Sequence, residues 1–313
     1  MLAPGETFFS KNTPVAEKLP TRKGVGLPKH FLNIPAVYRL GTRWSGYIPT
    51  FLSYTFSQGI ADLSYLFCKS AVRNVKQNLK LALPTSSEKE ISRLTIQLFR
   101  NYSKYLVDYC RFTSLSKNAV LEKIASYHGK ENLDSALRMG KGLILLTAHL
   151  GNWELGGIFF GSNGIKTNVI TIKDQDSQID DIRRWYRERY NVTTITIGES
   201  PFSTMEIMKA LNNKEIVAML IDRYNDGLDS ITINFFNKPT LFPRGPLILS
   251  RLTGAPIVVA FVVREKKTYK GIIEKPLIVR SEDEECEIIK KVVKILEEHI
   301  IKYPDQWYNF TPI

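Results

Sequence analysis

Cysteine, histidine and methionine are scarce in this chain of 313 residues, which has three, four and five of them, respectively. The cysteines, at positions 68, 110 and 286, lie far apart without the spacing of zinc ligands, and three thiols cannot all pair internally. The histidines form no His-Glu-x-x-His sequence, so no catalytic zinc site is indicated. We therefore expect a reducing compartment, buried thiols, and neither a metal nor another bound cofactor.

Signatures of several protein classes are also absent. There is no P-loop, no glycine-rich dinucleotide fingerprint, no Gly-x-Ser-x-Gly nucleophile elbow and no internal repeat. Residues 1–28 lack the apolar core of a secretory signal. The most apolar early segment, residues 47–67, carries Pro49, Gln58 and Asp62 and is too polar to cross a bilayer comfortably. We therefore expect a protein without a cleaved signal and without a clear membrane-spanning helix.

Acidic residues are outnumbered by basic ones, 31 to 43, which gives a formal net charge of +12. Such an excess favours anionic partners, which include nucleic acids, anionic membrane surfaces and acidic proteins such as a carrier protein. The basic residues are dispersed, and no helix-turn-helix, zinc or RNA-binding signature accompanies them, so we expect no nucleic-acid partner. A membrane surface fits the charge better.

Aromatic residues gather in and around residues 47–67. Two interpretations stay open: the segment lies in the headgroup region of a membrane, flanked by basic residues, or its aromatics pack on the protein's own core. The aromatics are Trp44, Tyr47, Phe51, Tyr54, Phe56, Tyr65 and Phe67, and the flanking basic residues are Arg39, Arg43, Lys69 and Arg73.

The hydrophobic periodicity divides the chain into three parts. Residues 1–40 are predicted to be a loose leader. Residues 41–118 are predicted to be an N-terminal helical segment, membrane-interfacial under the first of the two interpretations above, with one helix over 55–82 and a second after a capping box that starts at Ser87. Residues 119–313 alternate strands and helices, which predicts an α/β domain with a mixed, mostly parallel sheet flanked by helices. We expect strands at 121–128, 142–148, 168–172, 193–197, 216–221 and 256–263, and helices at 132–139, 177–189, 203–212, from Gly245 to Leu252 and after 281–285.

The most informative stretch begins with an unbroken apolar run at 142–148, which leads directly into His149 and then Asn152, Trp153 and Glu154. Such a run predicts a strand buried on both faces, and Asn152 is a good N-cap for a helix beginning at Trp153. On one continuous helix, side chains five positions apart diverge by about 140°, but with His149 on the turn it can meet Glu154. We predict that Glu154 orients His149 as a general base; the alternative is a satisfied histidine and a glutamate favoured by the helix dipole.

Further polar residues follow other predicted strands or begin helices. Asp222 and Arg223 come after an apolar strand, at the sheet edge where ligands usually bind, although they precede a strong turn signal. Gly245 opens a helix whose backbone N–H groups suit a phosphate or an oxyanion, and Arg244 beside it suits an anion. Arg264 ends a predicted strand and could contact a phosphate, although an arginine at a strand end is more commonly just solvated. We take these residues, with Asn152, as candidates for substrate binding.

The stretch from His149 to Glu154 resembles the motif of the lysophospholipid acyltransferase superfamily, a His followed five positions later by an Asp or Glu. Its Gly-Asn-Trp-Glu form resembles the bacterial lipid A biosynthesis acyltransferase branch, of lauroyl or myristoyl type. Other similarities are Asp222 after its strand, the segment from Phe235 to Gly245, and a Pro-x-Gln-Trp sequence that ends at Trp307; the family usually has a small or hydroxyl residue where Arg244 stands. The resemblance implies a glycerol-3-phosphate acyltransferase-like fold.

The resemblance also implies an activity. His149 would deprotonate a lipid hydroxyl that attacks a fatty acyl thioester on acyl carrier protein or CoA, with Glu154 as its partner and backbone amides near Gly151 or Gly245 as oxyanion donors. The acceptor would be an anionic glycolipid or phospholipid, a lipid A precursor by family majority, and the enzyme would sit on the cytoplasmic face of the inner membrane, peripheral or monotopic. Alternatives are an acyl thioester hydrolase, an acyltransferase for another glycolipid or phospholipid, and a catalytically silent lipid-binding protein.

Overall fold

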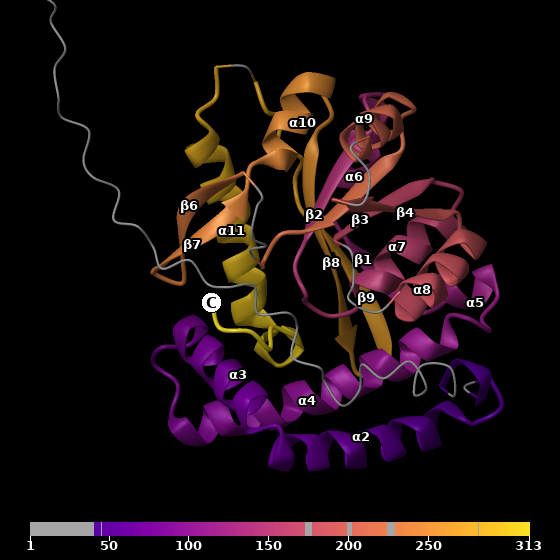
Figure 1. The fold of residues 1–313 in the computed structure, drawn as a ribbon, viewed down its shortest axis with the longest axis vertical. Helices are drawn as coiled ribbons and strands as arrows, with labels where there is room; N and C mark the ends of the chain where they lie inside the picture. The colour runs from indigo at the N-terminus through magenta and orange to yellow at the C-terminus, as the bar shows by residue number, and fades with distance from the viewer. Residues whose placement is uncertain (1–40, 45, 173–176, 199–201, 224–228, 281) are drawn as a thin grey trace, which may run out of the picture.

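A mixed, mostly parallel sheet with helices on both faces forms the centre of the molecule (Figure 1). The computed structural model describes residues 41–44, 46–172, 177–198, 202–223, 229–280 and 282–313. Within these ranges the sheet has seven strands in the order β1-β9-β8-β2-β5-β3-β4. All neighbours are parallel except β8 and β9, which form an antiparallel hairpin. The strands are β1 (Ile124–His128), β2 (Leu143–Thr147), β3 (Thr167–Ile172), β4 (Val192–Ile197), β5 (Ile216–Leu220), β8 (Ile257–Glu265) and β9 (Thr268–Ile273).

Strand β2 is buried on both faces, as its sequence predicts. Ile144 and Leu146 pack in one cluster with residues of α9 (Ser203–Asn212), α10 (Gly245–Thr253) and α11 (Glu285–Lys302). Leu143 and Leu145 pack in another with residues of α6 (Lys130–Arg138) and α7 (Trp153–Ser162). The continuous apolar run of β2 is therefore explained by helices on both sides of the sheet.

Three helices from the N-terminal half lie across one end of the sheet in Figure 1: α2 (Thr50–Phe67), α3 (Lys69–Ala82) and α4 (Glu88–Arg111). The single helix expected over 55–82 is wrong, because the chain bends at Cys68, which has a ψ of 59° and separates α2 from α3. The predicted capping residue is confirmed, since the Ser87 hydroxyl accepts a hydrogen bond from the Glu90 backbone N–H at 3.2 Å. The Glu90 side chain instead binds Arg93.

Two features of the fold were not expected from the sequence. A separate antiparallel hairpin, β6 (Ser230–Phe235) and β7 (Lys238–Pro243), turns at Phe236 and Asn237, which have positive φ of 50° and 61°. Strand β9 reverses direction after β8 and pairs in parallel with β1, which makes the sheet mixed. The remaining helices are α5 (Lys117–Leu121), α8 (Ser177–Arg189) and the 3₁₀ turn η1 (Pro304–Gln306).

The predicted division at residues 40 and 118 stays a prediction, and the leader at 1–40 lies outside the described residues. No helix within the described ranges has both the length and the apolar character needed to cross a bilayer. The same part of the chain contains no group of three or more His, Cys, Asp or Glu side chains placed to hold a metal ion.

Candidate active site

His149 lies on the turn between β2 and α7, and the surrounding backbone fixes that turn. Gly151 has a φ of 68°, and a Cβ at this position would lie 2.1 Å from the Val262 carbonyl oxygen, so only glycine fits. The Asn152 side chain accepts a hydrogen bond from the Leu155 N–H at 3.0 Å and caps α7, as predicted. The loop that carries His149 is therefore held by the neighbouring strand β8.

The C-terminal segment holds the same loop from the other side. The Tyr308 N–H donates to the His149 carbonyl at 2.7 Å, and the Gly151 N–H donates to the Gln306 carbonyl at 2.9 Å. Trp307, only 1% exposed, packs beneath the loop. The Gly151 N–H itself is thus already bonded. The expectation that backbone amides near Gly151 or Gly245 donate to an oxyanion stays a prediction.

Asp222, which follows β5, is the carboxylate that contacts His149. Its Oδ1 lies 2.7 Å from His149 Nδ1, and its Oδ2 accepts hydrogen bonds from the His149 backbone N–H at 3.1 Å and from Trp307 Nε1 at 3.0 Å. Since β2 and β5 are parallel neighbours, their carboxyl ends bring the two residues together. The geometry fixes Nδ1 as the donor and leaves Nε2 as the acceptor.

The electrostatics favour a neutral base beside a charged carboxylate. Burial opposes ionisation of Asp222 and by itself would raise its pKa. The opposing effects are larger: the charge and hydrogen bond of His149, the charge of Arg223 and the hydrogen bond from Trp307 lower the pKa of Asp222 to about 2. Burial and the nearby charge of Arg223 lower the pKa of His149 from its usual value, against the opposing effect of Asp222. His149 therefore stands neutral near pH 7 and able to accept a proton.

Glu154 does not meet His149. Its carboxylate accepts hydrogen bonds from Arg187 Nε at 3.1 Å, from the second Arg187 nitrogen and from the Tyr186 hydroxyl. Helix α7 begins at Trp153, and on its first turn the Glu154 side chain contacts α8. The expected contact between His149 and Glu154 is wrong, because a buried arginine on α8 takes the carboxylate and Asp222 takes the histidine.

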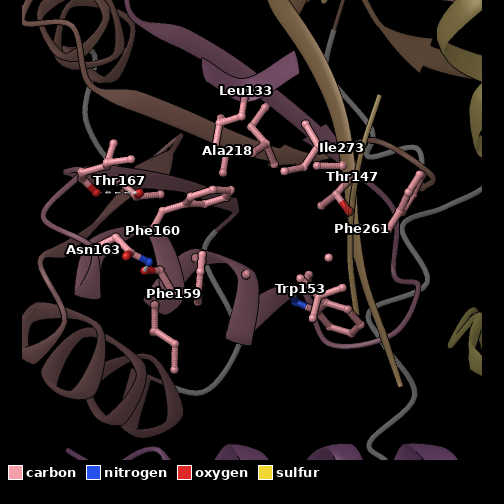
Figure 2. A pocket seen from close by; sticks show the side chains of 18 of the residues that line it. Leu133, Thr147, Trp153, Phe159, Phe160, Asn163, Thr167, Ala218, Phe261 and Ile273 are labelled. Atoms are coloured by element: carbon pink, nitrogen blue, oxygen red, sulfur yellow. Dashed lines mark hydrogen bonds between the residues drawn. The ribbon is translucent and has the colours of Figure 1, made fainter. Parts of the chain in front are cut away.

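An apolar pocket of about 440 Å³ lies between the sheet and helices α6 and α7 (Figure 2). His149 is not one of its lining residues, but the neighbouring Trp153 is, and so are Glu154 and Arg187. Trp153, whose ring lies 5.0 Å from that of His149, and Thr147 line the part nearest the histidine. Leu133, Phe160 and Asn163 line a part away from Trp153 in the same view. Gly156 and Gly157 of α7 leave room along its wall. This volume falls within the range typical of small-molecule sites.

Arg223 follows Asp222 after the end of β5, and its charge acts on His149. One of its terminal nitrogens donates to the Tyr308 carbonyl, and its Nε is buried without a hydrogen-bond partner in the described part of the chain. Burial lowers the pKa of the guanidinium, which nevertheless stays far above neutrality in an arginine. A half-buried positive charge that acts on His149 and has a spare buried N–H suits a developing negative charge.

The other predicted substrate-binding residues are engaged inside the protein. Asn152 donates to the Tyr269 hydroxyl at 3.2 Å, so its amide caps α7 and also reaches β9. Arg244 pairs with Asp229 at 3.1 Å and with Glu285 at 2.6 Å. Arg264 binds Asp108 and the hydroxyls of two tyrosines, and Gly245 begins α10 without lining the pocket. Their contact with substrate stays a prediction.

Sequence reasoning missed Trp307 and Arg187 as parts of this arrangement. Trp307 had a signal, since it closes the Pro-x-Gln-Trp sequence, but its contact with Asp222 spans 85 positions. Arg187 lies in an arginine-rich helix and has no local feature that distinguishes it from Arg183, Arg184 or Arg189.

The comparisons with known proteins identify the family of this chain. The family model for bacterial lipid A biosynthesis acyltransferases matches residues 35–312. A lipid A biosynthesis lauroyltransferase of Escherichia coli is 24% identical over 283 residues, 88% of this chain and 84% of that protein. A phosphatidylinositol mannoside acyltransferase of Mycobacterium tuberculosis is 24% identical over 217 residues, 68% and 67% of the two chains, and one of Mycolicibacterium smegmatis is 26% identical over 218 residues, 68% and 69%. The chain therefore belongs to the bacterial lipid A biosynthesis acyltransferase family and is an acyltransferase.

Proposed function

We propose that this enzyme moves a fatty acyl chain from an acyl thioester, on acyl carrier protein or CoA, to a hydroxyl of a lipid acceptor, with His149 as the general base and Asp222 as its orienting partner. The observation that carries the proposal is the 2.7 Å contact between His149 Nδ1 and Asp222 at the end of a buried strand. An apolar pocket lined by the nearby Trp153 supports it. This arrangement supplies a base and an orienting acid without a protein nucleophile.

The chemistry balances with these groups alone. His149 Nε2 takes the proton of the acceptor hydroxyl as its oxygen attacks the thioester carbonyl, and Asp222 stabilises the resulting imidazolium. The tetrahedral intermediate then collapses, the carbon–sulfur bond breaks, and the imidazolium returns its proton to the departing thiolate. The products are a lipid ester and a free thiol, so no metal, oxidant or second nucleophile is required.

The pocket gives the acyl chain a place to bind. Its lining is mostly aliphatic and aromatic and includes Thr147 and Trp153. The Trp153 ring lies 5.0 Å from that of His149, so we propose that an acyl chain seated in the pocket passes Trp153 and presents its thioester carbonyl to His149. Arg223 is the proposed donor to the oxyanion, since its Nε lacks a partner among the described residues.

The acceptor and the setting follow from the relatives and the charge. The relatives include both lipid A and phosphatidylinositol mannoside acyltransferases, and both names refer to lipids. We propose a lipid A precursor, because the lauroyltransferase match covers the larger share of both chains. A formal charge of +12 suits an acidic carrier protein and an anionic membrane surface. We propose that the enzyme acts on the cytoplasmic face of the inner membrane, as a peripheral or monotopic protein.

The first experiment compares the wild-type enzyme with His149→Ala, using an acyl thioester with and without a lipid A precursor. Removal of the base should lower kcat/KM by about a thousandfold while the circular dichroism spectrum is retained. The Tm should fall somewhat, because the buried Asp222 carboxylate loses its partner. Activity within a few-fold of wild type would rule out the base role.

The same assay separates the alternatives. Rapid release of free fatty acid without the lipid would identify a thioester hydrolase, and absence of turnover in the wild-type enzyme with every acceptor would identify a silent lipid-binding protein. Mass spectrometry of lipids from cells with and without the gene would then identify the acceptor and the acyl chain together.

A further inference from the structure

The outer face of α2 is apolar and nearly free of charge. Phe51, Phe56 and Phe67 are 67%, 74% and 77% exposed. Other large apolar side chains exposed in or just before this helix are Trp44, Tyr47, Ile48, Leu52, Leu63 and Leu66. The only charged residue in the helix, Asp62, is paired with Arg100 of α4 at 2.7 Å. An exposed apolar patch of this kind marks an interaction surface.

The inner side of α2 is firmly attached, so its outer face is a fixed surface. The Tyr54 hydroxyl donates to Asp108 of α4 at 2.8 Å, and Ala61 is buried at the contact between the helices. Arg264, at the end of β8, also donates to Tyr54. The apolar face therefore remains outward because the opposite face is already bonded to the rest of the fold.

A basic groove lies beside the C-terminal end of α2. Lys69, Arg73, Lys76 and Lys80 line a hollow of about 340 Å³ on α3, together with Tyr65 of α2. Their spacing places all four on one face of the helix. Lys80 pairs with Glu88, but Lys69, Arg73 and Lys76 form no ion pair with any residue that the structure describes. Three uncompensated positive charges thus border the apolar face.

We propose that the outer face of α2 inserts into the interfacial layer of an anionic phospholipid bilayer while the basic groove of α3 binds lipid phosphates next to it. An apolar face alone or a basic patch alone binds a membrane weakly, whereas the two together give stable association. A second copy of this chain is a poorer occupant, because it would bring one basic groove toward another. A nucleic acid would leave the apolar face uncovered.

The position of this surface suits a lipid substrate. In Figure 1, α2 lies on the outer side of α4, across from the sheet. His149 follows β2 and reaches the same end, since Trp153 beside it packs against Tyr105 of α4 with ring centroids 4.7 Å apart. A bilayer on α2 would therefore lie at the end of the molecule that carries the base. This surface is an addition to the proposed function, and its binding test does not depend on acyl transfer.

The test is a flotation assay of the full chain with vesicles of phosphatidylcholine alone or of phosphatidylcholine with phosphatidylglycerol. We expect the wild type to bind the anionic vesicles more tightly, and more weakly as salt is raised. The variant Lys69→Gln/Arg73→Gln/Lys76→Gln should lose about fivefold in affinity per charge for anionic vesicles only. The variant Phe51→Ser/Phe56→Ser/Leu63→Ser should lose about tenfold or more for both vesicle types.

Matched controls remove equal charge or equal apolar area elsewhere. Lys290→Gln/Lys291→Gln/Lys294→Gln alters exposed lysines of α11. Phe202→Ser/Met205→Ser/Leu252→Ser alters three apolar residues, 61%, 65% and 63% exposed, at the start of α9, in α9 and in α10, at the other end of Figure 1. Both controls should bind as the wild type does. The proposal is overturned if the controls lose as much as the test variants, if neither test variant weakens binding, or if sedimentation shows a dimer that the α2 variant dissociates and that does not bind vesicles.

Discussion

Asp222 and Glu154 are two buried carboxylates near the loop that carries His149, and they bind different partners. The Asp222 side chain is fully buried and pairs with His149, which is 19% exposed. The Glu154 side chain pairs with Arg187, and these are only 8% and 4% exposed. Histidine changes its charge near neutral pH, whereas arginine does not. Of these two pairs, the one that contains His149 can therefore change its protonation state near neutral pH.

The two pairs are otherwise built alike. Each carboxylate also accepts a hydrogen bond from an aromatic side chain, Trp307 on Asp222 and Tyr186 on Glu154. Burial opposes ionisation of both carboxylates, and in both the partner's charge and hydrogen bonds lower the pKa below the usual value. The comparison shows that a carboxylate close to a histidine in sequence need not be its partner. Here Glu154 lies five positions from His149, but Asp222, 73 positions away at the end of β5, binds it.

Asp222→Asn is the strongest test of this comparison. Loss of the negative charge lets the His149 ring adopt the wrong tautomer and leaves the imidazolium without stabilisation, so kcat should fall by at least about a hundredfold. Steady-state kinetics with a lipid acceptor would measure the change, and the Tm would show that the fold is retained. Activity within about fivefold of wild type in a folded variant would show that Asp222 does not orient His149 for catalysis.

Glu154→Gln should affect stability more than chemistry. It leaves the Arg187 charge buried without a counter-charge, and breaking such a pair costs about 3 kcal/mol of unfolding free energy. Urea unfolding would measure this loss, while kcat of the folded fraction should stay within about tenfold of wild type. If kcat instead fell as far as in Asp222→Asn with stability unchanged, Glu154 would act in catalysis.

Local patterns in the sequence predicted most of the fold and the position of His149 at the end of a buried strand. The apolar run at 142–148, the Asn152 cap and the strand–helix alternation are local signals, and the structure confirms each of them. The partners of His149 and Glu154 could not be predicted in this way, because each depends on which strands or helices become neighbours. The break at Cys68 and the turn at Phe236 lack a glycine or proline at the position itself, so their backbone conformations carried no clear signal.

Arg223→Leu should change the pH dependence of the reaction. The positive charge of Arg223 lowers the pKa of His149, so removing it raises that pKa. The base must be neutral to act, and the acidic limb of the kcat/KM profile should therefore move to higher pH. A profile with its acidic limb unchanged would show that this charge does not reach His149. Loss of the proposed oxyanion donor should also lower kcat at every pH.

The smallest expected effects come from the matched aromatic donors. Trp307→Phe removes one hydrogen bond from Asp222, which still binds His149, and should lower kcat by about fivefold, the equivalent of about 1 kcal/mol. Tyr186→Phe removes the corresponding bond from Glu154 and should lower the unfolding free energy by about 1 kcal/mol without changing kcat. Measuring kcat and urea unfolding for both variants separates the two pairs. Equal losses of kcat would mean that both carboxylates support the same chemistry, because a purely structural pair has no means of slowing the folded enzyme.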